Sequence, residues 1–483
     1  MSKNIKSITN PALRLDILPM EAVQRIHTAT LDVIENVGVR FPSPKVLEIW
    51  EAHGAHVDRS TSIVKVPGQV IEAALKTAPP VYDLAARDPS QDLPLDGNHV
   101  FVGTDGCGVE VVDIYTGERR SSCLQDVADI ARIADAVEEI GFHWVPVSAQ
   151  DRPAATRSLH ELLAVWENSS KHVQTESIYS EREALAANEM AAIIAGGKEA
   201  LRKRPLLSMM QCTASPLGQD GGSLEAALVA AEAGVPVGFM TMAACLTTGP
   251  ATMAGNLVVG NAEVISATAL IQLAYPGAPV YYAAAQTASD LRSGAYTGGG
   301  PEDFLFGAAT NVLSDYYKIP LSMGSFATGA KTPNWQAGLE NSLSTFMACV
   351  VMSDMLLGVG LLHGSRIWSY DQMLMDCEIF SIIHKMMQGI PVNDETLALD
   401  AIRQSGPGGN FLTQKHTRQH MREVFLPQFM DRRPYNVWQE KQDGAADWAL
   451  SKARQILASH APDPLDPALS AELRRIIAAL EVE

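Results

Sequence analysis

The chain has 483 residues, and its hydrophobic content of 47% is enough for a large buried core. A formal net charge of −18 argues against nucleic-acid partners, because binding to a phosphate backbone requires clustered lysine and arginine. The N-terminus has no apolar signal segment, and the most apolar long stretch, residues 251–274, contains Asn, Glu and Gln side chains typical of a packed helix. Six scattered cysteines without a CxxC pair are typical of a reducing compartment. We therefore expect a cytoplasmic protein with no nucleic-acid or membrane partner.

The N-terminal region predicts helices and a small sheet. Apolar residues recur at helical spacing from Val23 to Val37, and two more short helices are expected at Pro44 and Pro67. Two extended runs follow and predict a small antiparallel element: residues 99–103 and 109–115. We assign residues 1–122 to this N-terminal extension.

From about residue 123, helical segments alternate with short apolar runs of strand type. Seven such runs are expected to be strands: 142–147, 172–176, 206–211, 235–241, 279–285, 319–323 and 355–361. This alternation predicts a parallel sheet, and the number of units favours a closed (β/α)8 TIM barrel of the α/β class. Residues 366–372 are the candidate for the eighth strand. No Gly-x-Gly-x-x-Gly follows the first of these runs, which disfavours a dinucleotide-binding fold. The barrel domain is assigned to residues 123–390.

The C-terminal part predicts helices again, near 373–387 and 469–480. A Gly-Pro-Gly-Gly turn at residues 406–409 interrupts them. It is either a hinge that carries the C-terminal segment over the barrel mouth or a plain surface turn. Residues 391–483 are assigned to a C-terminal helical extension.

Two loops carry residues that folding alone does not require. The first loop spans residues 297–303. Gly299 and Gly300 have no side chains and lie just before a helix that is expected to begin at Pro301. Glu302 lies in the first helical turn, where it is either a catalytic acid or base, or an ordinary partner of the helix dipole. The second loop, residues 325–338, follows a strand and contains hydroxyl, lysine and tryptophan side chains. Loops after barrel strands hold the chemistry of barrel enzymes.

These two loops, followed by Gly-Val-Gly-Leu-Leu-His-Gly at 358–364, resemble in order and spacing the trimethylamine methyltransferase family. The resemblance runs from the N-terminal helices to about residue 430. It implies a barrel methyltransferase that moves a methyl group from a methylated amine to a corrinoid, carried by a separate small protein. Archaeal trimethylamine enzymes of the family contain pyrrolysine, whereas this chain contains only the twenty common residues. The resemblance therefore implies the non-pyrrolysine branch, whose members demethylate glycine betaine, proline betaine, carnitine or γ-butyrobetaine.

Chemistry supports the same division. A quaternary ammonium leaves as a neutral tertiary amine and needs no electrophilic assistance, so its enzyme acts mainly by positioning. Such a cation requires aromatic faces within about 6 Å. Core packing is the alternative for each aromatic residue at a predicted strand end. The aromatic candidates for substrate binding are Trp144, Tyr282, Tyr296, Phe326 and Trp368.

A betaine also carries a carboxylate, for which Arg292 and Arg366 are candidates, each being alternatively a surface charge. His363 is a candidate partner of substrate or corrinoid, or else a structural histidine. Gln211 and Gln286 end predicted strands and offer neutral donors.

Lys331 supports a different class of function. A lysine after a barrel strand suits a Schiff-base lyase if burial lowers its pKa, although solvent exposure is the ordinary expectation in a glycine-containing loop. A non-catalytic betaine or corrinoid binder is a third class. We expect no protein-bound metal, and we expect a homo-oligomer.

Overall fold

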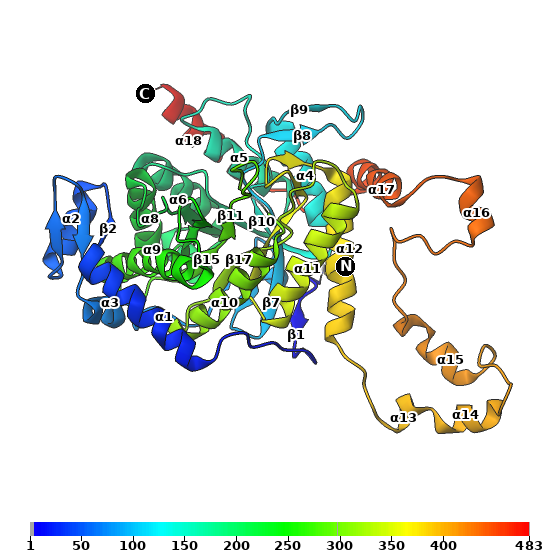
Figure 1. The fold of residues 1–483 in the computed structure, drawn as a ribbon. Coiled ribbons are helices and arrows are strands. Elements are labelled where there is room, and N and C mark those ends of the chain that lie inside the picture. The colour runs from blue at the N-terminus through cyan, green and yellow to red at the C-terminus, as the bar shows by residue number, and fades with distance from the viewer. Residues whose placement is uncertain (1–3, 297, 483) are drawn as a thin grey trace.

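The computed structural model describes residues 4–296 and 298–482, and its centre is a closed parallel barrel (Figure 1). Neighbouring strands pair in the order β7, β10, β11, β12, β13, β15, β17, β18, and β18 returns to β7. The barrel strands are β7 (His99–Thr104), β10 (Ile140–Trp144), β11 (His172–Thr175), β12 (Leu207–Cys212), β13 (Val237–Thr241), β15 (Val280–Ala284), β17 (Leu321–Gly324) and β18 (Met355–Val359). The predicted (β/α)8 fold and all seven predicted strands are confirmed.

The prediction for the eighth strand was wrong. Residues 99–104 form the first barrel strand, β7, which pairs in parallel with β10 and β18. The candidate at 366–372 instead contains the two-residue strand β20 (Ile367–Trp368) and the start of a helix. The sequence did not identify β7 as a barrel strand because the short strands β5 (Tyr82–Leu84) and β6 (Leu93–Leu95) precede it, so the alternation of strands and helices does not extend back to it. β7 also accepts the short strand β1 (Ile8–Thr9) in antiparallel pairing.

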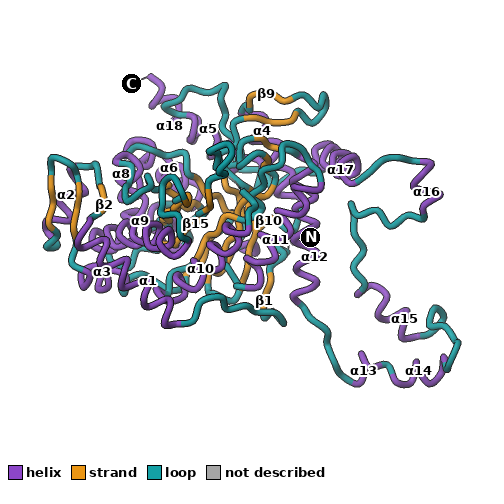
Figure 2. Tube along the Cα trace, in the orientation of Figure 1, coloured by secondary structure: helices purple, strands orange, loops and turns teal. Residues whose placement is uncertain are grey.

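The outer layer of the barrel consists of helices that follow the strands (Figure 2). They are α4 (Leu124–Ala136), α5 (Arg157–Asn168), α6 (Glu181–Ala195), α7 (Lys198–Lys203), α8 (Gly221–Ala233), α9 (Met253–Ala274), α10 (Pro301–Tyr317), α11 (Trp335–Val350) and α12 (Tyr370–Met387). Of the described helices, α9 has the length and hydropathy of a membrane span, but 83% of its most apolar window is buried inside the protein. It packs between the barrel and the N-terminal helices, as its polar residues predicted.

Side chains alternate between the inside and the outside of the barrel. Phe101, Phe142, Met210, Tyr281 and Leu357 belong to the apolar cluster that fills the interior. Glycines make room for the rings: a Cβ on Gly238 would lie 2.0 Å from Tyr281, and one on Gly103 would lie 2.5 Å from Phe142. The barrel is therefore a packed core below its mouth.

The N-terminal elements pack on one side of the barrel and agree with the predicted helices. They are α1 (Met20–Asp32), the π-helix η1 (Val33–Val37), β2 (Val39–Arg40), α2 (Pro44–Ala52), β3 (His56–Asp58), β4 (Ile63–Lys65), α3 (Gly68–Leu75), β5 (Tyr82–Leu84), η2 (Pro89–Gln91) and β6 (Leu93–Leu95). Gly38 ends the first helical segment with φ 94°, a conformation that favours glycine. Ser43 caps α2 by accepting a hydrogen bond from the Val46 amide.

A second, four-stranded sheet lies at the carboxyl ends of the barrel strands. It contains β8 (Glu110–Val112), β9 (Arg119–Ser121), β19 (Leu361–Leu362) and β20. The predicted antiparallel pairing of 99–103 with 109–115 was wrong, because β8 pairs with β9 across the turn at residues 113–118. A short parallel pair, β14 (Ala244–Cys245) and β16 (Thr287–Ala288), extends β13 and β15 at the same end.

The C-terminal helices α17 (Ala445–Ser459) and α18 (Pro467–Val482) cover the barrel helices, α17 against α12 and α4, and α18 against α5 and α6. Between α12 and α17 the chain leaves the body through α13 (Asp394–Leu397), α14 (Leu399–Ser405), α15 (Lys415–His420), η3 (Met421–Glu423) and α16 (Tyr435–Glu440) (Figure 1). The Gly-Pro-Gly-Gly sequence forms a turn in this segment and does not lie over the barrel mouth.

Candidate active site

Three titratable side chains continue the series of inward-facing residues beyond the carboxyl ends of the barrel strands, at the mouth of the barrel. Asp105 follows Phe101 and Gly103 by steps of two, Glu176 follows His172 and Gln174, and Cys212 follows Met210. Since the strands are parallel, their carboxyl ends meet at one end of the barrel. These residues therefore converge on the mouth from β7, β11 and β12.

The Glu176 carboxyl group is paired with the thiol of a fourth residue, Cys107, in the loop after β7. The Cys107 Sγ donates to Glu176 Oε1 at 2.6 Å, while the buried Glu176 Oε2 has no hydrogen-bond partner within residues 4–296 and 298–482. Burial raises the pKa of Glu176 to about 7, and the nearby Asp105 carboxyl adds to the shift. Cys107 is exposed as a residue, yet protein atoms around its thiol and the nearby Glu176 and Asp105 carboxyls raise the pKa of the thiol well above its usual value. The thiol therefore stays protonated and orients the carboxyl group, leaving one oxygen free for a ligand.

Asp105 is the second carboxyl group, and it is only 4% exposed. It accepts hydrogen bonds from Ser365 Oγ at 2.6 Å and from the Gly106 amide at 2.9 Å. Burial raises its pKa to about 7 despite these donors. Two carboxyls with raised pKa values in mutual electrostatic range share protons near neutral pH, which is typical of functional sites.

Aromatic faces lie beside the carboxyls. Trp144 is 4% exposed and lies directly under Gly106, where an added Cβ would be 2.4 Å from its indole ring. Its Nε1 has no hydrogen-bond partner among the described residues. Tyr296 donates its hydroxyl to Ala285 O at 2.8 Å and lies within electrostatic range of Asp105 and Asp303. The Tyr296 side chain is 39% exposed, yet protein atoms surround the phenol and raise its pKa. The arrangement of carboxyls and aromatic faces suits an organic cation.

The glycine loop forms the start of α10 as predicted. Pro301 is the first helical residue and Gly300 is the cap, and Asp303 accepts the Gly300 amide at 3.2 Å. Gly299 has φ 81°, and a Cβ there would lie 2.6 Å from Glu340, so only glycine fits. Asp303, rather than Glu302, makes the capping bond and also bonds Thr287; burial raises its pKa to about 7. Thr297, the first residue of the motif, lies outside the described residues.

Basic side chains gather on the other side of the mouth, on the turn between β19 and β20. His363 lies in this turn, and its pKa is lowered by partial burial and by the charges of Lys331 and Arg366. The same turn supplies Ser365, which bonds Asp105. Lys331 is exposed and donates to the Gly329 carbonyl, so the burial that a Schiff-base lysine requires is not met. The mouth thus has an acidic and a basic part joined through Ser365.

Five predicted substrate contacts have packing roles in the structure. Tyr282 points outward, away from Tyr281, and its hydroxyl donates to Asn261 on α9 at 3.3 Å, because adjacent strand residues face opposite sides. For the same reason Gln211 and Gln286 point outward and donate to backbone carbonyls of Ile178 and Asn256, each at 3.0 Å.

Phe326 and Trp368 are 0% exposed and belong to the main core outside the barrel. Trp368 packs against Gly360, where a Cβ would lie 2.6 Å from its ring.

The two arginines that were candidates for the substrate carboxylate are exposed. They are Arg292, in the turn organised by Asp290, and Arg366. The sequence therefore predicted the loops of the mouth better than the direction of individual side chains.

The prediction did not select Asp105, Cys107, Glu176 or Cys212. Glu176 was detectable, because it extends the inward alternation of His172 and Gln174 by one step. Asp105 and Cys107 were missed because β7 was not assigned to the barrel. Among residues 4–296 and 298–482, no group of three or more His, Cys, Asp or Glu side chains could hold a metal ion.

Comparison with known proteins shows the family to which the chain belongs. The family model described as trimethylamine methyltransferase (MTTB) matches residues 1–483. The chain belongs to this family. The trimethylamine methyltransferase of Desulfitobacterium hafniense is 36% identical over 466 residues, covering 96% of this chain and 93% of that protein. A glycine betaine methyltransferase of the same species is 34% identical over 469 residues, covering 96% and 97%. The trimethylamine methyltransferase of Methanosarcina barkeri is 32% identical over 472 residues, covering 96% and 95%.

The fold of this MTTB-family chain also matches a solved structure. The crystal structure of the Methanosarcina barkeri monomethylamine methyltransferase aligns with a TM-score of 0.51 over 97% of this chain and 96% of that one, at 11% identity. This likeness concerns the fold alone. The predicted family membership and the predicted methyltransferase activity are both confirmed.

Proposed function

We propose that this methyltransferase removes one methyl group from a quaternary amine that carries a carboxylate, glycine betaine being the first candidate, and transfers it to the Co(I) of a corrinoid on a separate protein. The observation that supports the proposal is the meeting of Asp105 and Glu176 with the Trp144 ring at the barrel mouth. A quaternary ammonium has no N–H to donate, so carboxylates and aromatic faces are the groups that attract it.

The unpartnered Glu176 Oε2 and the Trp144 face would hold the trimethylammonium group. During transfer the N–CH3 bond breaks, its electron pair stays on nitrogen as a neutral tertiary amine, and the acceptor supplies the pair for the new bond to carbon. Because the positive charge on nitrogen disappears, very strong binding of the cation would slow the reaction. Two carboxyls with pKa values of about 7 share protons and provide a moderate attraction.

The carboxylate of a betaine has a place on the basic side of the mouth, near Lys331, Arg366 and His363. A zwitterion would thus lie with its cation at Glu176 and its anion toward the turn between β19 and β20. Proline betaine, carnitine and γ-butyrobetaine carry the same two charges at other separations and are the alternative substrates. The exposed basic side chains also suit an approach by a protein-bound acceptor from this face.

The proposal is tested by mixing the protein anaerobically with Co(I) cobalamin and, in a second series, with a reduced corrinoid protein. Each series includes glycine betaine, proline betaine, carnitine, γ-butyrobetaine and trimethylamine. Loss of the Co(I) absorption band with one quaternary amine, and formation of the tertiary amine in equal amount, is the expected result. Turnover of trimethylamine alone would contradict it. Tight binding without turnover in either series would indicate a non-catalytic binder.

A further inference from the structure

The segment from residue 388 to residue 428, here called the arm, stands away from the rest of the molecule (Figures 1 and 2). No residue in this range is buried. Ten of its large apolar side chains are exposed: Ile390, Val392, Leu397, Leu399, Ile402, Phe411, Leu412, Met421, Val424 and Leu426. The exposed fraction reaches 89% at Ile390 and 83% at Leu412. So many exposed apolar residues in one continuous segment indicate a surface that is covered by another molecule.

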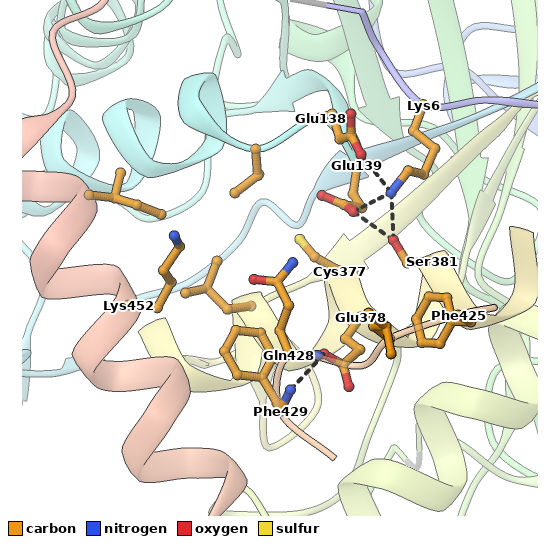
Figure 3. Close-up of a pocket in the computed structure, with 14 residues that line it drawn as sticks. Lys6, Glu138, Glu139, Cys377, Glu378, Ser381, Phe425, Gln428, Phe429 and Lys452 are labelled. Atoms are coloured by element: carbon orange, nitrogen blue, oxygen red, sulfur yellow. Dashed lines mark hydrogen bonds and ion pairs between the residues drawn. The ribbon is translucent and has the colours of Figure 1, made fainter. Parts of the chain in front are cut away.

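Both ends of the arm are fixed to the body. At its start, the Ala12 amide donates to the Met387 carbonyl at 2.8 Å. At its end, the Glu378 carboxylate accepts the amides of Gln428 and Phe429 at 2.6 and 2.7 Å (Figure 3). Phe429 is buried there beside a cavity of about 230 Å³. The arm is therefore a defined projection between two anchors rather than a free chain end.

The arm also has internal structure. Within α15 the rings of His416 and His420 are tilted against each other with centroids 4.2 Å apart. His416 also bonds the Glu395 carbonyl at 3.2 Å, and this bond links α15 to α13, although neither helix has a buried residue. The short helices gain little stability from packing on their own chain, and helices of this length are marginal in water. A partner surface would supply the missing apolar contacts.

A matching surface lies beside the root of the arm. Helices α11 and α12 enclose an apolar groove of about 540 Å³. Small residues on α11, Gly338 and Ser342, form one wall, and Met375, Ile379 and Ile382 on α12 form the other. Along its edge, Trp335, Leu339 and Leu343 follow one another at helical spacing and are 79%, 42% and 47% exposed. The groove has the form that receives an apolar helix face.

We propose that the occupant of this groove is the arm of a second copy of the same chain, with the two copies exchanging arms. Phe429 and Met430, at the root of the arm, line the groove themselves, so arm and groove share one side of the molecule. A twofold axis beside them therefore places each arm over the other copy's groove, in a self-complementary interface.

Charge is compatible with this pairing. The arm has four acidic and four basic residues, whereas the whole chain has a formal net charge of −18. A neutral arm can approach an acidic copy of the same protein without strong repulsion. The arm leaves from the end of α12 that is far from the barrel mouth, because α12 begins at the mouth after β20 and ends at Met387. The groove begins at Pro333 and Asn334 in the loop at the mouth, whereas α13 to α15 lie far from the mouth (Figure 1). A methyl acceptor must reach the mouth, so it is disfavoured as the molecule that covers the arm.

The first test is the mass of the full chain by sedimentation velocity and light scattering across micromolar concentrations. Wild type is expected to be a dimer or a multiple of two. Leu399→Asp combined with Ile402→Asp should weaken the assembly by at least tenfold in dissociation constant, with unchanged circular dichroism since neither residue is buried. Gln404→Asp, an exposed polar position on the same helix, is the matched control and should assemble as wild type.

The groove is tested separately with Gly338→Arg. An added Cβ at Gly338 meets nothing within 4 Å, so the side chain can enter the groove without disturbing its own fold. This variant should also lose assembly. A monomeric wild type, or an assembly that both variants leave unchanged, would overturn the proposal.

Mixed isotope labelling identifies the partner. Unlabelled and ¹⁵N-labelled copies, mixed and crosslinked from a photoreactive group at position 402, should give hybrid peptides that join the arm of one copy to α11 or α12 of the other. Crosslinks only within copies would overturn the proposal. So would arm variants that remain dimeric but lose methyl transfer to a corrinoid protein while retaining it with free cobalamin, because the arm would then bind the acceptor.

Discussion

The Cys107 thiol donates a hydrogen bond to Glu176, with Sγ and Oε1 2.6 Å apart, and this bond joins the loop after β7 to the end of β11. It fixes one carboxyl oxygen, while the other, Oε2, is buried and has no partner in the part of the chain that the structure describes. A buried acceptor without a partner lowers the free energy of unfolding unless a ligand or a water molecule donates a hydrogen bond to it or pairs with its charge. The Asp105 carboxyl lies within electrostatic range of Glu176, and the Trp144 indole packs under Gly106, the residue that follows Asp105.

Replacing Glu176 by glutamine removes the charge while keeping the size of the side chain. We expect affinity for glycine betaine to fall about tenfold or more, roughly 1.4 kcal/mol, because the cation loses a charged partner. Isothermal titration calorimetry with wild type and Glu176→Gln measures the change. Glu118→Gln, an exposed carboxylate in the turn between β8 and β9, is the control and should bind normally. Equal affinities of wild type and Glu176→Gln would remove Glu176 from the site.

Binding should depend on pH through the two carboxyls. Asp105 and Glu176 have pKa values of about 7, so they are mainly protonated at pH 6 and mainly ionised at pH 8. A quaternary cation favours the ionised form, and its affinity should therefore rise with pH by roughly threefold to tenfold over this interval. The carbon isostere 3,3-dimethylbutanoate keeps the shape and the carboxylate but lacks the positive charge, and its affinity should show no such rise. A flat profile for glycine betaine would contradict the assignment.

Folding stability should show the opposite dependence in the absence of ligand. Both carboxyls have raised pKa values in the folded protein, so the folded state holds more protons than the unfolded state between about pH 4 and pH 7. Their contribution to stability therefore decreases as pH rises through this window. A bound cation offsets the loss, and glycine betaine should raise the melting temperature more at pH 8 than at pH 6. A larger shift at pH 6 would count against a cation at these carboxyls.

Gly106→Ala should disturb the Trp144 ring without changing any charge. The added Cβ would lie 2.4 Å from the indole, which forces the ring or the loop to move. We expect weaker binding of glycine betaine and a change in tryptophan fluorescence on titration. Gly444→Ala is the control, because a Cβ there meets nothing within 4 Å. If Gly106→Ala binds as wild type does, the Trp144 face is not part of the cation site.

Tyr282→Phe separates packing from binding. The Tyr282 hydroxyl bonds Asn261 on α9, outside the barrel, so its loss should cost about 0.5 to 1.5 kcal/mol of unfolding free energy and leave betaine affinity unchanged. Urea denaturation and calorimetry measure the two quantities. A loss of affinity with unchanged stability would return Tyr282 to the site.

Lys331 distinguishes methyl transfer from Schiff-base chemistry. Because Lys331 is exposed, sodium borohydride should trap no carbonyl compound on it. Lys331→Gln should retain methyl transfer to free cobalamin, with no more than a moderate rise in KM for a substrate that carries a carboxylate. Mass spectrometry of the borohydride-treated protein checks the first expectation. A stable adduct at Lys331, absent from Lys331→Gln, would favour the lyase.

The sequence by itself determined the fold class and the loops of the mouth. The alternation of apolar runs with helices predicted seven barrel strands, because parallel strands buried on both faces are continuously apolar. Pro301 and the glycines before it predicted the start of α10, since cap positions depend on local backbone geometry. The order of the loop motifs also predicted the family.

Only the tertiary structure decided which residues face the mouth. Barrel closure requires β7 to pair with both β10 and β18, and these contacts lie far apart in the sequence. Without that pairing, Asp105 and Cys107 could not be placed beside Glu176. Tyr281 and Tyr282 are the same residue type at adjacent positions of one strand, so the local sequence does not show which of them points inward. The register of β15 with β13 and β17 decides that it is Tyr281. Side-chain direction is set by pairing between distant strands, which local sequence patterns do not contain.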